Sequence, residues 1–176
     1  MCRQAFSSRS NSRRPVQPAP SSCAFGYAKP CDAPVEPKQQ MERVIFACVH
    51  NAGRSQMAAA FFAAVADPAK AEAVSAGTEP ADRVHPGVVD AMREIGIDLS
   101  RSEPQLLTNE LARRVSLLIT MGCGESCPYV PGLARDDWPV SDPKNQPLTE
   151  IRRIRDEIRE RVLRLVESRH WLPDRS

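Results

Sequence analysis

Short apolar runs along the chain predict four β-strands. The runs over 44–48 and 115–121 are apolar almost throughout, and both contain β-branched residues. Continuous runs of this length are typical of strands that lie buried on both faces of a parallel sheet. Weaker runs over 72–78 and 138–140 predict two further, shorter strands.

Longer segments carry apolar residues with the period of an α-helix. The first, over 57–65, places five residues on one predicted face: Met57, Ala60, Phe61, Ala64 and Val65. Further helices are predicted over 86–95, which Gly96 ends, and over 108–114. The last helix, over 148–166, has an apolar stripe made of Ile151, Ile154, Ile158, Val162 and Leu165.

Strands that alternate with helices predict a three-layer α/β fold, in which helices flank a four-stranded parallel sheet. In such sheets, ligands bind beside the carboxyl ends of the strands. Cys48 and Cys123 each directly follow a predicted strand. These two cysteines are therefore the first candidates for a functional site.

The overall composition is that of one globular domain, with 41% hydrophobic and 26% charged residues in a chain of 176. The net charge of +2 is too small to favour a nucleic acid or a membrane as partner. The sequence has neither an apolar run of about 20 residues that could span a bilayer nor the apolar core of a signal peptide. We therefore expect a cytoplasmic protein.

Residues 1–40 differ from the rest of the chain. They contain six prolines, six serines and six basic residues but two acidic ones, and no hydrophobic period runs through them. Such a segment buries too little apolar surface to offset its ordering entropy, so we expect a disordered extension over 1–40 and a folded domain over 41–176. Two interpretations compete: Met41 is the natural start, which a strand close behind it favours, or the tail is a transit peptide.

The sequence contains six cysteines, Cys2, Cys23, Cys31, Cys48, Cys123 and Cys127. A domain of this length does not need disulfides for stability, and no secretion signal is visible. We therefore expect thiols with chemical roles, although the three in the extension receive none.

The segment between the first strand and the first helix reads CVHNAGRS over 48–55. A loop that leads into a helix points backbone N–H groups and the positive end of the helix dipole at one place, which suits a tetrahedral oxyanion. Gly53 can supply the positive φ that a tight loop often needs, and the Arg54 guanidinium can bind two oxyanion oxygens. The same field stabilises the Cys48 thiolate, which is a nucleophile. The alternative is that Cys48 is a small core residue and Arg54 a surface cation.

The stretch CVHNAGRSQMA resembles the active-site loop of the low-molecular-weight protein tyrosine phosphatase superfamily, and it is most similar to the arsenate reductases of that superfamily. The resemblance extends over about 41–166 and implies the phosphatase-like fold. It implies Cys48 as nucleophile, Arg54 as oxyanion clamp, Asn51 as the residue that shapes the loop, and a Ser55 hydroxyl that supports the thiolate. The implied oxyanion-binding loop consists of Val49, His50, Asn51, Ala52, Gly53, Arg54 and Ser55.

The segment WPVSDP over 138–143 resembles the loop that carries a general acid in this family. By this resemblance, Asp142 protonates the oxygen that leaves when the thiolate attacks. Asp136 and Asp137 are the alternatives, which we interpret as solvated loop charges. An Asp-Pro pair also marks ordinary turns, so the assignment depends on the family match and on the position after the last strand.

Cys123 and Cys127 distinguish a reductase from a phosphatase, because reduction needs two electrons and two thiols can supply them by forming a disulfide. Residues four apart on a helical turn have Cα atoms about 6 Å apart, within the disulfide range. In the implied reaction Cys48 attacks arsenate, Cys123 attacks Cys48 and releases arsenite, and Cys127 moves the disulfide outward to an exposed Cys123–Cys127 bond. Thioredoxin or an equivalent thiol reductant then reduces that bond. The alternatives are buried apolar residues, zinc ligands shared with the extension, or incidental residues of a phosphatase.

The sequence thus predicts a thioredoxin-coupled arsenate reductase, to which we assign no metal and no cofactor. The alternative is a low-molecular-weight protein tyrosine phosphatase, but such enzymes place aromatic residues after the Asp-Pro pair, and Lys144, Asn145 and Gln146 follow here. A non-catalytic thiol sensor of arsenic or metal is a third possibility, which gives Arg54 and Asp142 no purpose. Relatives that use mycothiol or glutathione lack the second cysteine pair, so the pair favours thioredoxin.

Overall fold

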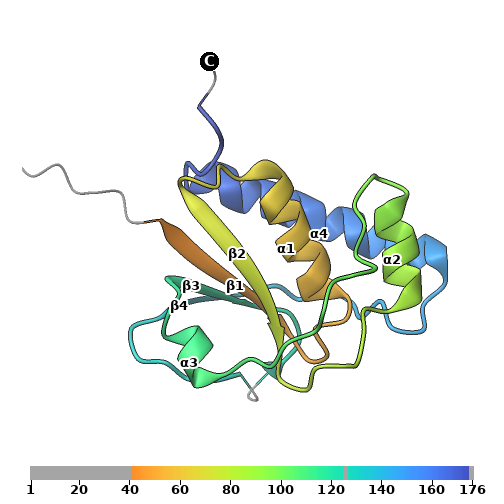
Figure 1. Cartoon of the computed structure of the whole chain (residues 1–176), viewed down its shortest axis with the longest axis horizontal. Helices are drawn as coiled ribbons and strands as arrows, with labels where there is room; N and C mark the ends of the chain where they lie inside the picture. Colours follow the sequence, from red (N-terminus) through yellow and green to blue (C-terminus); the bar gives the residue numbers. More distant parts are fainter. Residues whose placement is uncertain (1–40, 125–126, 175–176) are drawn as a thin grey trace, which may run out of the picture. The chain divides into compact units, whose positions relative to one another are not determined.

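The computed structural model describes residues 41–124 and 127–174 (Figure 1). The extension predicted over 1–40 lies outside the described residues, as do Cys2, Cys23 and Cys31. None of the helices in the described ranges has both the length and the apolar character that crossing a membrane requires.

The described chain contains one four-stranded sheet in which all strands are parallel, as predicted. Its strands are β1 (Glu42–Cys48), β2 (Ala71–Gly77), β3 (Leu117–Thr120) and β4 (Ala134–Asp137). They lie in the order β2-β1-β3-β4, so the chain leaves β1 toward β2 on one side and later returns to the other side with β3. This reversal is a topological switch point, where the loops that follow β1 and β3 diverge and leave room for a ligand.

The fourth strand does not lie where the sequence analysis placed it. It was predicted over 138–140, but β4 ends at Asp137, and all four of its side chains are exposed. An edge strand with the sequence ARDD has no alternating apolar pattern, so its residues gave no signal. Trp138 and Val140 are buried in the segment that follows, and the Trp138 ring packs 5.6 Å from that of Phe46.

Helices cover the two faces of the sheet unequally (Figure 1). One face packs against α1 (Arg54–Val65) and α4 (Leu148–Ser168), and α2 (Pro86–Arg93) lies beside α4. The other face is covered by α3 (Asn109–Ala112) and by loops that bury a smaller apolar cluster. Helix α3 begins one residue later than predicted because Thr108 is its N-cap, with its side chain accepting a hydrogen bond from the Leu111 N–H at 3.1 Å, and it ends at Ala112 rather than at 114.

The buried face of α1 differs from the predicted one. Ala64 is exposed and Ala60 is half-buried, whereas Ala58 and Phe62 are buried together with Met57 and Phe61. The segment from Met57 to Val65 is apolar throughout, so its pattern could not select one face. Packing selects it: the Phe62 ring lies 6.0 Å from Phe46 and 5.7 Å from Trp171.

The apolar stripe of α4 is buried as predicted, except that Val166 replaces the half-buried Leu165 at its end. Arg155 is also buried on this helix, and its Nη1 donates to the Ala91 carbonyl oxygen at 2.8 Å. The bond satisfies a carbonyl near the carboxyl end of α2, which ties that helix to α4.

We expect Phe62→Ala to lower the free energy of unfolding by about 3–5 kcal/mol, because it removes a fully buried ring from the core. Ala64→Gln, on the exposed side of the same helix, should change it by less than about 0.5 kcal/mol. Urea unfolding followed by circular dichroism measures both. Equal losses in the two variants would contradict this orientation of α1.

Candidate active site

The predicted nucleophile is the last residue of β1, directly before the loop that leads into α1. The Cys48 side chain is buried, and its Sγ lies 3.0 Å from Ser55 Oγ in the first turn of α1. Of the cysteines in the described ranges, Cys48 alone is not in a disulfide. The thiol therefore lies in a closed environment, where a hydroxyl can donate a hydrogen bond to its deprotonated form.

The loop from Val49 to Gly53 turns its carbonyl groups away from the centre of the site. The carbonyl oxygens of Val49, His50 and Ala52 accept hydrogen bonds from the backbone N–H groups of Glu79, Ala81 and His85, at 2.8–2.9 Å. Within the described part of the chain, the backbone N–H groups of residues 50–55 donate to no protein acceptor, and no side chain caps α1. Unpaired N–H groups at the start of a helix form a binding site for an anion.

Asn51 shapes this loop, whereas Gly53 does not supply the positive φ that was predicted for it. The residue with positive φ is Asn51, at 47°, whereas Gly53 has a φ of −150°. Asn51 is fully buried: its Nδ2 donates to Ser55 Oγ at 2.8 Å, and its Oδ1 accepts from the Gln105 N–H at 2.8 Å. These bonds hold Asn51 in the left-handed region that its short polar side chain tolerates.

Gly53 is needed for close packing rather than for its φ. A Cβ at this position would lie 2.7 Å from Pro143 Cγ, so the Asp142–Pro143 segment approaches the loop because Gly53 has no side chain. Gly77 at the end of β2 has a similar role, since a Cβ there would lie 2.6 Å from the Val49 carbonyl oxygen. Both glycines let neighbouring segments close around the loop.

The Arg54 guanidinium is buried and joins the loop to Asp142. Its Nη2 lies 2.7 Å from Asp142 Oδ2, and its Nη1 donates to the Val140 carbonyl oxygen at 3.4 Å. Its Nε is buried without a hydrogen-bond partner in the described residues. The alternative that Arg54 is a surface cation is therefore wrong, since the side chain is 93% buried.

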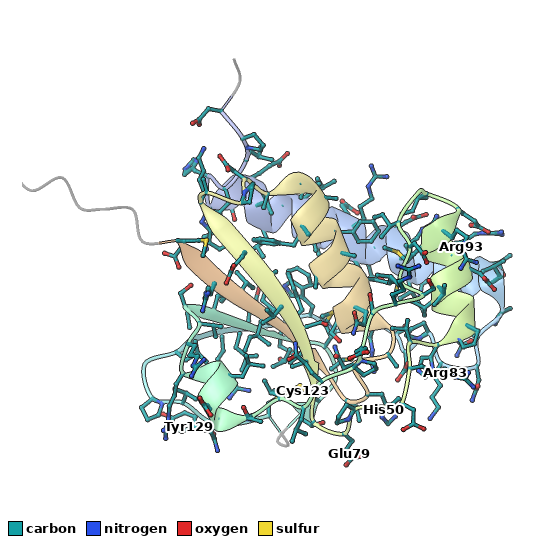
Figure 2. The ribbon with its side chains drawn as sticks, viewed as in Figure 1. His50, Glu79, Arg83, Arg93, Cys123 and Tyr129 are labelled. Carbon is teal, nitrogen blue, oxygen red and sulfur yellow. A yellow bond between two sulfur atoms is a disulfide. The ribbon has the colours of Figure 1, made fainter. Side chains whose placement is uncertain are left out.

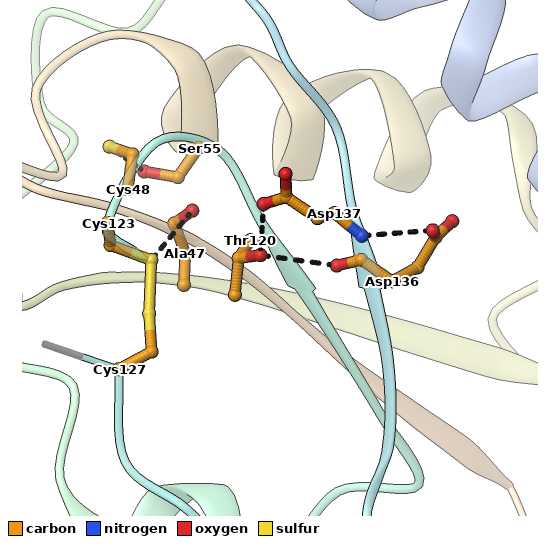
Figure 3. The surroundings of a disulfide bond; sticks show 8 residues. All are labelled: Ala47, Cys48, Ser55, Thr120, Cys123, Cys127, Asp136 and Asp137. Carbon is orange, nitrogen blue, oxygen red and sulfur yellow. Dashed lines mark hydrogen bonds between the residues drawn. A yellow bond between two sulfur atoms is a disulfide. The ribbon is translucent and has the colours of Figure 1, made fainter. Parts of the chain in front are cut away.

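The two alternative acids lie elsewhere, along β4. Asp137 Oδ1 accepts from Thr120 Oγ1 at 2.5 Å (Figure 3). Asp136 Oδ2 accepts from Trp138 Nε1 at 3.0 Å. Neither forms an ion pair with Arg54. Of the three candidate acids, the fold therefore brings Asp142 into the site.

Cys123 and Cys127 form the expected disulfide, with Cα atoms 6.0 Å apart (Figure 3). The sequence analysis expected this bond to be exposed, and that expectation is wrong, because the structure buries it. Both residues are buried among Ile45, Ala47 and Leu118, on the face of the sheet opposite α1. Cys123 Sγ lies 4.0 Å from the carbonyl oxygen of Ala47, the residue before Cys48. The pair thus lies beside the end of β1, as parallel pairing of β1 with β3 requires.

Two histidines belong to the loop or contact it: His50, which the sequence analysis included in it, and His85, which it did not single out and whose N–H donates to the Ala52 carbonyl oxygen. The His50 Nδ1 lies 3.2 Å from the Glu79 carbonyl oxygen (Figure 2). Burial lowers the pKa of His85, the residue before α2; Asp142 opposes this, while Lys144, His50 and Arg54 add to it. His85 is therefore biased toward its neutral form. The only sequence signal for it was the His-Pro pair at a helix start.

The chain belongs to the low molecular weight phosphotyrosine protein phosphatase family, whose model matches residues 43–170. Among its relatives, a putative arsenate reductase of Halobacterium salinarum is 36% identical over 126 residues, which are 69% of this chain and 89% of that protein. A glutaredoxin arsenate reductase of Synechocystis is 36% identical over 129 residues, 72% of this chain and 97% of that protein.

A solved structure of a thioredoxin-dependent arsenate reductase from Corynebacterium glutamicum is similar, with a TM-score of 0.64 and 38% identity. The match covers 74% of this chain and 62% of that one, so this chain spans less than two thirds of that protein. An arsenate reductase from Archaeoglobus fulgidus matches with a TM-score of 0.61 and 33% identity, over 70% of this chain and 98% of that one.

We expect Asn51→Ala to lower the free energy of unfolding by about 2 kcal/mol more than Asn145→Ala, measured by urea unfolding. Both residues have positive φ, 47° and 58°, so both alanines meet the same backbone strain. Asn145 is exposed, whereas the Asn51 amide makes buried hydrogen bonds to Ser55, Gln56 and Gln105. Equal destabilisation would mean that these bonds do not hold the loop.

Proposed function

We propose that this protein reduces arsenate to arsenite, with Cys48 as the nucleophile and the Cys123–Cys127 pair as the source of two electrons. One observation carries the proposal: a free thiol in an anion-binding loop lies at one strand end, and a disulfide-forming pair lies beside the next. A phosphatase of this fold uses the first feature alone, whereas a reductase needs both.

The oxyanion binds in the loop formed by Val49, His50, Asn51, Ala52, Gly53, Arg54 and Ser55. The unpaired N–H groups of residues 50–55 and the positive end of the α1 dipole stabilise its charge. The buried, unpartnered Nε of Arg54 supplies a further donor. A bound oxyanion competes with Asp142 for the guanidinium, and the carboxyl group that it displaces is placed to donate a proton to the leaving oxygen.

In the first step, the Cys48 thiolate attacks arsenic. A sulfur–arsenic bond forms and one oxygen leaves as water, with one of its protons delivered by Asp142 and the other already on the oxyanion or drawn from solvent. Ser55 Oγ, 3.0 Å from the sulfur, stabilises the thiolate before the attack and after its release. Arsenic remains pentavalent at this stage.

In the second step, the Cys123 thiolate attacks the Cys48 sulfur. A Cys48–Cys123 disulfide forms, the sulfur–arsenic bond breaks, and arsenic keeps that electron pair and leaves as arsenite. Cys127 then attacks Cys123, which releases the Cys48 thiolate and leaves a Cys123–Cys127 disulfide. A free Cys48 together with this disulfide, as described above, corresponds to the last state in this series of exchanges.

A dithiol protein of the thioredoxin type, or an equivalent thiol system, returns the pair to its reduced form. We prefer thioredoxin because the two thiols of such a protein can reduce the Cys123–Cys127 disulfide and form a disulfide of their own in exchange. Both sulfurs are buried, so this step needs local opening of the segment around them. Gly122 and Gly124, which flank Cys123 and have positive φ, give the segment freedom to move. A reducing compartment such as the cytoplasm suits this chemistry.

We expect arsenate-dependent oxidation of NADPH when the protein is coupled to thioredoxin and thioredoxin reductase. Cys48→Ser, Cys123→Ser and Cys127→Ser should each abolish turnover, because each removes a sulfur that the sequence of exchanges needs. Full turnover in Cys123→Ser would disprove the mechanism. Efficient hydrolysis of p-nitrophenyl phosphate that survives Cys127→Ser, with no arsenate turnover, would indicate a phosphatase instead.

The order of the exchanges can be read from a trapped intermediate. After exposure of Cys127→Ser to arsenate, we expect peptide mass mapping to find a Cys48–Cys123 disulfide, because the last exchange cannot occur. The same variant without arsenate is the control and should contain no such bond. Absence of the bond in both samples would place Cys123 outside the reaction.

We expect Asp142→Asn to lower kcat for arsenate by about 10²–10⁴-fold, the usual effect of losing a general acid. Asp137→Asn is the matched control, since Asp137 ends β4 beside Thr120 of β3 and contacts Thr120 rather than Arg54. Steady-state kinetics with the coupled assay measures both. Unchanged kcat in Asp142→Asn would assign the proton to another group.

A further inference from the structure

Gly122 lies where the segment that carries the redox cysteines meets the oxyanion site. Its φ is +77°, and a Cβ at this position would lie 2.6 Å from Arg54 Nη1 and 3.6 Å from Arg54 Cζ. The guanidinium therefore occupies the space that a side chain at position 122 would fill. The residue before it is fixed, because the Met121 N–H donates to the Ala47 carbonyl oxygen at 2.7 Å.

The guanidinium is confined on three sides. Asp142 binds Nη2 at 2.7 Å, the Val140 carbonyl oxygen accepts from Nη1 at 3.4 Å, and the Gly122 backbone lies against Nη1. The side chain is buried, so it cannot turn toward an oxyanion without a change in one of these neighbours. The position of Gly122 is thus one of the contacts that determine the orientation of the Arg54 guanidinium.

Gly122 precedes Cys123, whose sulfur is covalently bound to Cys127. The disulfide restrains the backbone of Cys123, and with it that of Gly122. Reduction removes this restraint on a segment in which Gly122 and Gly124 both have positive φ. The contact between Gly122 and Arg54 therefore connects the redox state of the pair to the oxyanion site.

We propose that Gly122 is a positioning residue that couples the Cys123–Cys127 pair to Arg54, so that the oxidised protein binds oxyanion more weakly than the reduced one. In the disulfide form, Gly122 holds the guanidinium on Asp142, and an oxyanion must displace it. In the dithiol form, the relaxed segment lets the guanidinium turn to the oxyanion. The inference deepens the proposed function, on which it rests for the identity of the site, and it explains how spent enzyme avoids rebinding substrate.

The test uses inorganic phosphate, a tetrahedral oxyanion that the thiols cannot reduce, and isothermal titration calorimetry on the whole chain. We expect the Kd of the reduced wild-type protein to be lower than that of the disulfide form by about fivefold or more, the usual lower bound of coupling between two sites. By reciprocity, phosphate should shift the equilibrium of the pair in a glutathione buffer toward the dithiol by the same factor.

Gly122→Ala should weaken phosphate binding and remove the difference between the two redox forms. The atom that meets the new methyl group is the end of a side chain, so the guanidinium moves and the backbone does not have to. Gly132→Ala is the matched control: Gly132 has a φ of +80°, but a Cβ there has no neighbour within 4 Å. It meets the same backbone strain and should keep the redox difference.

Equal phosphate affinity in the two wild-type forms would overturn the inference, and so would a Gly122→Ala variant that keeps the difference. The wild-type comparison does not depend on the folding of any variant. Phosphate binding needs no turnover, so the outcome is separate from that of the arsenate assay. Redox-dependent binding without arsenate reduction would remove the proposed function and leave this coupling in place.

Discussion

The buried Arg54 guanidinium is the group around which the site is organised. A charge taken out of water is costly unless partners compensate for it, and here the compensation comes from a distant part of the chain. Asp142 and the Val140 carbonyl oxygen lie more than 80 positions away in sequence, yet both contact the guanidinium. The need to satisfy this one cation therefore draws the loop after β4 over the start of α1, and it brings a carboxyl group to the first residue of that helix.

The order of the strands supplies the second requirement of the proposed reaction, which is that the Cys123–Cys127 pair lies close to the end of β1. Because β1 and β3 are parallel neighbours at the switch point, the residues that follow them leave the sheet at the same edge. Cys48 ends one strand and Cys123 follows the other by three residues. The pair is buried in the smaller apolar cluster, so the fold stores it as a packed disulfide rather than on an exposed loop. Its reduction must therefore involve local opening, which glycines on both sides of Cys123 permit.

Close approaches of backbone hold the anion loop in shape. The segment from Thr78 to His85 binds the outward carbonyl groups, and Gly77 and Gly53 let β2 and Pro143 come within contact of the loop. Asn51 then fixes the turn from inside through its amide. The carbonyl groups of Val49, His50 and Ala52 are satisfied by the surrounding chain, whereas the N–H groups of the loop are left without a protein partner in the described residues. For the oxyanion that we propose to bind here, the loop is already formed, which reduces the cost of ordering the loop on binding.

Local patterns in the sequence were enough to predict the parallel sheet, three of its four strands, the helices and the loop from Cys48 to Ser55, because burial on both faces and helical period leave direct traces in adjacent residues. The candidate for the general acid, Asp142, came from resemblance, since an Asp-Pro pair has no distinctive local pattern. Tertiary structure alone decided which face of α1 is buried, that β4 is the exposed ARDD segment, that Asn51 and not Gly53 has positive φ, and that the disulfide is buried. Each of these depends on a neighbour far along the chain: Trp171 for α1, β3 for β4, Gln105 for Asn51 and Ile45 for the disulfide. Such contacts arise only when the sheet and its helices have packed, so no short stretch of sequence contains them.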